Sequence, residues 1–156
     1  MKIALTWEKP IRLKDGTKFN QVYYCPKLDR ISNKAGVYVF ARSFGAVVAP
    51  LYVGQTLKLR KRIGQHFKSN VRLMIRLKRA DIGHRILFVG RLKLGRGQQK
   101  KKVLKIVESS LIKHALTQGH DLLNKQGIKT RVHTIKSKGN RSSKQVAPLT
   151  MLVERK

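Results

Sequence analysis

Residues 35–56 of the 156-residue chain read AGVYVFARSFGAVVAPLYVGQT, and this stretch decides the fold. The segments 36–41 and 47–53 are rich in β-branched and aromatic residues, and Gly45 lies between them. This pattern predicts two strands joined as a β-hairpin. Pro50 lacks the N–H group that a strand ladder needs, so we expect an exposed or irregular start to the second strand.

Two tyrosines lie in these predicted strands. Because alternate side chains of a strand share a face, Tyr38 points with Phe40, while Tyr52 opposes Leu51 and Val53. The two phenols are therefore expected to meet across one hairpin. Taken singly, each tyrosine would be an ordinary strand aromatic.

After Gly54 the apolar residues change to helical spacing, which predicts a helix from about residue 59 to residue 68, with Thr56 as its N-cap. Arg62 and His66 are four residues apart on this helix, so their side chains are neighbours on one surface. They would bring a guanidinium and an imidazole beside the tyrosines. Each of them alone would be an ordinary basic or filler residue.

The remaining elements follow from the same signals. Segments 11–14 and 17–24 flank Asp15-Gly16, a pair typical of a tight turn, and predict an opening hairpin. Downstream we expect a helix at 71–80, a strand at 85–92, a long helix at 100–117 that stops before Gly119, and strands at 130–135 and 146–153. The last two strands surround a Lys-, Ser- and Gly-rich segment, and this tail could instead stay disordered until DNA binds.

One carboxylate, Glu108, falls on the apolar arc of the long predicted helix, among Leu104, Leu111, Ile112 and Ala115. Burying it unpaired would cost several kcal/mol, so it should meet an arginine or a metal ion. Considered alone, the salt bridge is the commoner outcome. Because the chain has only 7 acidic residues, a site with several carboxylates is improbable. One divalent ion held by one carboxylate and waters fits better.

Charge limits the classes of function. The chain has 36 Lys and Arg and a formal net charge of +29, so a polyanion, most simply nucleic acid, is the expected partner. Arg72, Arg76 and Arg79 lie on one helical stripe suited to a phosphate backbone. There is no apolar run of roughly 18 residues and no signal or lipidation motif, so we expect no membrane association and a cytoplasmic or nucleoid-associated location. The single cysteine, Cys25, excludes an intrachain disulfide.

Together these residues resemble the GIY-YIG nuclease family, which includes the incision domain of bacterial excision repair and certain homing and restriction endonucleases. The resemblance covers about residues 35–124 and rests on Gly36-Val37-Tyr38, Tyr52-Val53-Gly54, Arg62, Glu108 and Asn124 in that order. Valine replaces isoleucine in both triplets, and Gln55 stands where some members have lysine. Asn124 is also a few residues farther from Glu108 than in the repair enzymes.

The resemblance implies an α+β fold, with a small three-stranded antiparallel sheet flanked by helices. The chain would be one domain, with a core at about 35–124, an N-terminal hairpin extension at 1–34 and a basic C-terminal extension at 125–156.

For function, the resemblance implies a metal-dependent DNA endonuclease, with RNA as another possible substrate. Glu108 would hold one Mg²⁺ (or Mn²⁺), Arg62 would contact the scissile phosphate, and Tyr38 and Tyr52, aided by His66, would lie near the attacking water. Asn124 would complete the site. The residues expected to bind nucleic acid are Gln55, Arg60, Arg72, Arg76, Arg79, Lys100, Lys101 and Lys102. The alternative is a non-catalytic nucleic-acid-binding protein, ribosome-associated or packaging, on the same fold.

Overall fold

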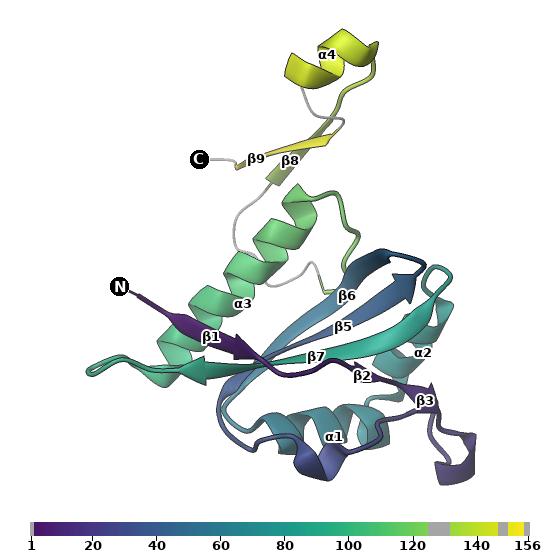
Figure 1. Ribbon diagram of the computed structural model, residues 1–156, viewed down its shortest axis with the longest axis vertical. Helices are drawn as coiled ribbons and strands as arrows, with labels where there is room; N and C mark the ends of the chain where they lie inside the picture. The colour runs from purple at the N-terminus through teal and green to yellow at the C-terminus, as the bar shows by residue number, and fades with distance from the viewer. Residues whose placement is uncertain (1, 125–131, 147–149, 155–156) are drawn as a thin grey trace.

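A five-stranded antiparallel sheet forms the centre of the computed structural model, which describes residues 2–124, 132–146 and 150–154 (Figure 1). Its strands are β1 (Ala4–Trp7), β2 (Ile11–Arg12), β5 (Gly36–Phe44), β6 (Val47–Thr56) and β7 (His84–Lys93). β5 lies between β6 and β7, and β1 and β2 pair with successive parts of the other edge of β7. The fold is therefore mixed α+β, and the expected three-stranded core is extended by two N-terminal strands.

Helices cover both faces of this sheet. One face carries α1 (Leu59–Ser69) and α2 (Val71–Arg79), and the other carries α3 (Lys100–Thr117) (Figure 1). In the described residues, no helix is both long and apolar enough to cross a lipid bilayer.

The β5–β6 hairpin forms as predicted, with Gly45 in the turn at a φ of 59°. Tyr38 pairs with Gly54 and Phe40 with Tyr52, but the register shifts after Phe40, where Ala41 pairs with Pro50. The irregularity expected at the proline is thus present. Because of this register shift, Leu51 and Tyr52 both pack with the cluster beneath α1, which strict alternation along the strand does not predict. The prediction that these two side chains oppose each other was wrong, since an extra residue in a strand resets its alternation.

The prediction of an opening hairpin with a tight turn at Asp15-Gly16 was also wrong in detail. The only pairing there joins β3 (Lys14–Asp15) to β4 (Tyr23–Tyr24), and a 3-10 helix, η1 (Thr17–Phe19), lies between them. The Asp15 carboxylate accepts a hydrogen bond from the Thr17 backbone N–H at 2.8 Å, and Gly16 has a φ of −99°. The carboxylate therefore starts a helical turn, where a tight hairpin would need positive φ angles. A second 3-10 helix, η2 (Leu28–Arg30), precedes β5.

The helix boundaries near the site lie close to the predicted ones, but one cap differs. Thr56 accepts a hydrogen bond from the Lys58 N–H at 3.1 Å, so it shapes the turn before α1 and does not cap the helix. Asn70 caps α2. α3 has the predicted bounds and ends before Gly119, whose φ is 84°.

The C-terminal part forms a separate two-stranded sheet of β8 (Val132–Lys136) and β9 (Thr150–Glu154), seen beyond the C-terminal end of α3 (Figure 1). A short helix, α4 (Arg141–Val146), occupies the second half of the loop expected between these strands and includes Val146, which was predicted to begin the second strand. The predicted strand positions at 130–131 and 147–149 lie outside the described residues.

Candidate active site

A buried phenol–imidazole pair forms the centre of the site. Tyr38 on β5 and His66 on α1 are each only 1% exposed, and the Tyr38 Oη lies 2.6 Å from the His66 Nε2. Tyr52 stacks on Tyr38 with ring centroids 6.3 Å apart, as the sequence predicted. The Tyr38 ring crosses the backbone of Gly54, where a Cβ atom would overlap the phenol. Glycine at this position therefore allows the phenol to lie across β6.

Burial controls the protonation of this pair. It lowers the pKa of His66 from 6.5 to about 4, with a smaller contribution from the Arg62 charge, so the imidazole is neutral near pH 7. Burial also raises the pKa of Tyr38 well above its ordinary range, with Tyr52 acting in the same direction. The phenol keeps its proton unless a nearby positive charge favours the phenolate.

Two opposite charges act on both phenols. The Arg62 guanidinium, exposed on α1, lowers the pKa of Tyr38 and of Tyr52, whereas the Glu108 carboxylate on α3 raises both. In each phenol burial remains the largest cause, and the pKa of Tyr52 is raised overall. A cation and a carboxylate on helices that cover opposite faces of the sheet therefore shift the pKa values of the same two phenols in opposite directions.

Glu108 is the half-buried carboxylate that the sequence predicted on the apolar arc. Burial raises its pKa, and the nearby Lys105 ammonium lowers it by less. Within the described chain, no Lys, Arg or His nitrogen lies within 4.0 Å of this carboxylate, so the expected protein cation is not its partner. Its hard oxygen atoms fit a divalent cation, although no group of three or more His, Cys, Asp or Glu side chains gathers in the described residues. The fit is to an ion held by one carboxylate and waters.

Asn124 lies against β6 and not in the phenol cluster. Its Oδ1 accepts from the Val53 backbone N–H at 3.1 Å, and its Nδ2 donates to the Val53 carbonyl oxygen. The preceding Leu123 N–H donates to the Leu51 carbonyl at 2.7 Å. Both ends of the amide are therefore used to hold the edge of β6 beside Tyr52, which gives Asn124 a positioning role.

A groove of about 800 Å³ opens beside Tyr52. Its polar lining comes from Asn70, Arg72 and Arg76 of the α1–α2 region and from Asp121 and Asn124. Arg76 is partly committed to the protein, because its Nη2 donates to the Leu123 carbonyl at 2.9 Å. Two of the three predicted α2 arginines thus line the same groove as Tyr52.

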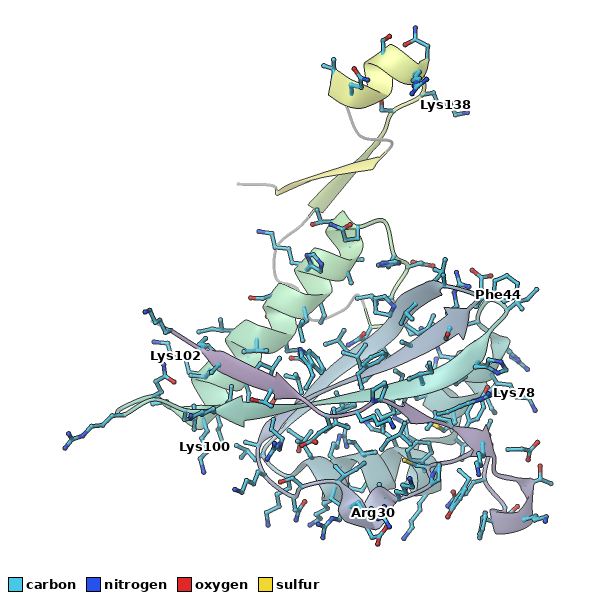
Figure 2. All side chains as sticks on the ribbon, in the orientation of Figure 1. Arg30, Phe44, Lys78, Lys100, Lys102 and Lys138 are labelled. Atoms are coloured by element: carbon cyan, nitrogen blue, oxygen red, sulfur yellow. The ribbon has the colours of Figure 1, made fainter. Side chains whose placement is uncertain are left out.

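The other predicted nucleic-acid contacts are more scattered. Arg79 is exposed at the end of α2, Gln55 is half-buried on β6, and the Arg60 Nε donates to the Ile31 carbonyl at 2.7 Å. The three lysines at 100–102 are exposed at the start of α3, and Figure 2 shows Lys100 and Lys102 at the end of the molecule away from Lys78 on α2. The structure brings Arg72 and Arg76, and not Arg79 or these lysines, to the groove.

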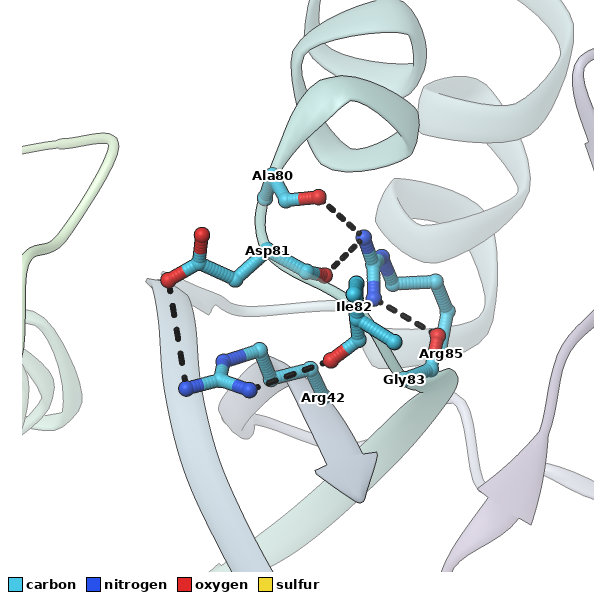
Figure 3. Close-up of polar contacts among 6 residues, drawn as sticks. All are labelled: Arg42, Ala80, Asp81, Ile82, Gly83 and Arg85. Carbon is cyan, nitrogen blue, oxygen red and sulfur yellow. Dashed lines mark hydrogen bonds and ion pairs between the residues drawn. The ribbon is translucent and has the colours of Figure 1, made fainter.

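A buried arginine that the sequence analysis missed anchors α2. Arg85 is 6% exposed and donates through its guanidinium to the backbone carbonyls of Leu77, Ala80, Asp81 and Gly83, the last three drawn in Figure 3. Arg42 supports the same turn by donating to the Ile82 carbonyl at 3.0 Å (Figure 3). A cation at a helix C-terminus satisfies the free carbonyls and opposes the helix dipole.

Asn70 is the second residue that was missed. Its Nδ2 lies 3.1 Å from the His66 Nδ1, and its Oδ1 accepts from the Leu73 N–H. An asparagine directly before a predicted helix and four residues after a histidine was the available signal.

No family model, curated protein or solved structure matches this chain.

Proposed function

We propose that the chain is a metal-dependent endonuclease that hydrolyses phosphodiester bonds of DNA through a GIY-YIG-type site. The observation that carries this proposal is the buried cluster of Tyr38, Tyr52 and His66, on whose phenols the exposed Arg62 and the half-buried Glu108 act electrostatically. Tyr38, Tyr52, Arg62 and Glu108 follow one another along the chain in the order of the family resembled. A chain with a formal net charge of +29 has little reason to bury a carboxylate unless the carboxylate performs a task.

The proposed reaction uses Tyr38 as the base. Its phenolate takes a proton from water, the water oxygen forms a bond to phosphorus, and the bond from phosphorus to the departing nucleotide oxygen breaks. That oxygen then takes a proton from solvent. Arg62 stabilises the negative charge on the pentacovalent phosphorus. Glu108 would hold the divalent ion, which when bound supplies Lewis-acid stabilisation of phosphate and leaving-group oxygens.

The raised pKa of Tyr38 gives this mechanism a pH signature. Below that pKa, the phenolate fraction grows tenfold with each pH unit, so the single-turnover rate should climb across the neutral range without a plateau. A Tyr38→Phe variant should lose this slope together with most of the rate.

The groove supports the binding part of the proposal. Arg72 and Arg76 line it together with Tyr52, so a backbone bound by α2 would pass Tyr52. Phosphate contacts of this kind position nucleic acid without reading its sequence.

The test is cleavage by the purified protein. Supercoiled plasmid, single-stranded DNA and structured RNA are each incubated with Mg²⁺, with Mn²⁺ or with EDTA, and Glu108→Ala serves as the matched inactive variant. We expect nicking or linearisation of DNA that requires the metal and Glu108. The absence of cleavage with every substrate and ion would contradict the proposal.

One observation favours the alternative, a non-catalytic nucleic-acid-binding protein. Burial stabilises the neutral form of each phenol and of His66, which suits a static core as well as a reacting one. In that case the wild type and Glu108→Ala would bind DNA tightly and neither would cut it.

A further inference from the structure

We propose that Asn70 is a positioning residue that fixes the tautomer of His66, so that the imidazole donates its N–H to the Tyr38 oxygen. The hydrogen-bond assignment stands on geometry alone, and its consequence for cleavage rests on the proposed function. Three hydrogen bonds in series carry the inference.

The first bond orients the Asn70 amide. The Leu73 backbone N–H lies 3.2 Å from the Asn70 Oδ1, and a backbone N–H can only donate. The carbonyl end of the side chain must therefore face α2, which leaves the amide NH₂ facing His66. The Asn70 backbone is held as well, because its N–H donates to the His66 carbonyl at 3.2 Å and its carbonyl accepts from Met74 at 3.2 Å.

The second bond selects the tautomer. The Asn70 Nδ2 is 3.1 Å from the His66 Nδ1, and an amide nitrogen can only donate, so Nδ1 accepts. A neutral imidazole with an accepting Nδ1 carries its proton on Nε2. His66 is 1% exposed, and among the described residues Asn70 is the one side chain with a hydrogen-bond contact to its Nδ1.

The third bond determines how the His66 tautomer orients the hydrogen bond at the Tyr38 phenol. The His66 Nε2 carries the proton and lies 2.6 Å from the Tyr38 Oη, so the phenol oxygen accepts and its own hydrogen turns away from His66. A hydrogen bond donated to this oxygen is stronger when the oxygen is ionised. Asn70 therefore favours the phenolate, whereas the opposite tautomer would take a hydrogen bond from the phenol and keep it protonated.

The chain allows variants that separate this role from helix capping. Asn70→Asp and Asn70→Ser both keep a side-chain oxygen that can cap α2. Asp replaces the donor to Nδ1 with an acceptor and demands an Nδ1 proton, whereas Ser leaves a shorter side chain in place of the amide donor. Asn33 provides the control position, because its Oδ1 accepts from the Lys61 backbone N–H at 3.2 Å in the same way. Asn33→Asp and Asn33→Ser should change neither His66 nor cleavage.

The first measurement is the tautomer itself, by long-range ¹H–¹⁵N correlation NMR of the His66 ring. We expect Nε2 protonated and Nδ1 bare in the wild type, with Nδ1 protonated in Asn70→Asp. A wild-type ring protonated at Nδ1 would overturn the proposal whether or not the protein cuts DNA.

The second measurement is single-turnover cleavage. Asn70→Asp should be slower by about tenfold to a hundredfold, as is common when a partner that orients a reacting group is lost. Asn70→Ser should lose less, and DNA affinity in EDTA should be unchanged in both. The predicted tautomer combined with unaltered cleavage in Asn70→Asp would overturn the positioning role. A wild type that cuts nothing would refute the endonuclease, while NMR would still decide the assignment.

Discussion

The two faces of the central sheet differ in chemistry although the same strands build both. On β5, Val37 and Val39 face α3, where Val37 packs in one cluster with Leu104 and Val39 in another with Ile112. Tyr38 and Phe40 alternate with them and face α1, where they enclose the imidazole of His66. One face thus buries hydrocarbon, and the other buries hydrocarbon together with polar groups that need partners.

We therefore expect the α3 face to stabilise the fold and the α1 face to carry the groups that take part in the proposed reaction. A buried hydrocarbon side chain stabilises the fold by its area and packing, and its loss should change stability only. A buried polar group also fixes the direction of hydrogen bonds and the protonation of its neighbours, so its loss should change the reaction. Glu108 lies at the boundary, since it belongs to α3 and yet acts on the phenols.

The largest effect on cleavage is expected from a substitution of Glu108. Glu108→Ala should abolish cleavage while leaving DNA affinity intact or raised, because the variant loses the metal ligand and one negative charge. Cleavage and filter binding of the same preparations measure the two effects, with the exposed neighbour Ser110→Ala as control. Equal cleavage by wild type and variant would remove Glu108 from the reaction.

Arg62→Ala should be the next most damaging change. A fixed cation at the phosphate typically contributes roughly 3 kcal/mol or more to the transition state, which is about a hundredfold or more in rate. Lys61→Ala removes an adjacent exposed cation and should leave the single-turnover rate nearly unchanged. If both variants merely weaken binding, Arg62 belongs to the general basic surface.

The polar face should also make the fold sensitive to acid. The pKa of His66 is about 4 in the folded chain, below its ordinary value of 6.5, so the unfolded chain binds a proton more readily. Stability is lost as pH falls from about 6.5 towards 4, by up to about 3 kcal/mol for the full difference. Urea unfolding near pH 7 and near pH 4 should show this loss, and His66→Gln should reduce it. An equal loss in the variant would assign the acid sensitivity to other groups.

Removing the α2 arginines should weaken binding without stopping the reaction. Each lost phosphate contact lowers the slope of log affinity against log salt by about 0.9, so a triple alanine variant of Arg72, Arg76 and Arg79 should lose roughly 2 to 3 units. The matched control replaces Lys100, Lys101 and Lys102 at the start of α3, which removes the same charge; Figure 2 shows Lys100 and Lys102 away from Lys78 on α2. A wild-type slope in the α2 variant would show that this helix faces away from nucleic acid.

The smallest effect should come from the aliphatic face. Val37→Ala removes two buried methyl groups and should lower the free energy of unfolding by about 1 to 3 kcal/mol. Its cleavage rate, measured well below the melting temperature, should equal that of the wild type. A slower reaction in a fully folded variant would mean that the two faces are not independent.

Local patterns in the sequence determined much of the architecture. Alternating β-branched and aromatic residues around Gly45 fixed the β5–β6 hairpin, and the apolar period fixed α3 at its observed bounds. Strand alternation and helical spacing also predicted that Tyr38, Tyr52 and His66 lie together, because both are properties of neighbouring residues.

Only the tertiary structure decided how these elements meet. The pairing of β1 and β2 with β7 uses backbone N–H and C=O groups, which nearly every residue has, so no pattern of side chains predicts it. The register shift at Ala41 moved Leu51 to the face of Tyr52, and the amide of Asn124 turned to the Val53 backbone. The sequence alone likewise could not predict which His66 nitrogen carries the proton. That choice depends on Asn70, which caps α2 and also contacts the His66 ring one helical turn earlier. Long-range hydrogen bonds set these features, since their partners are chosen by the packed fold and not by nearby residues.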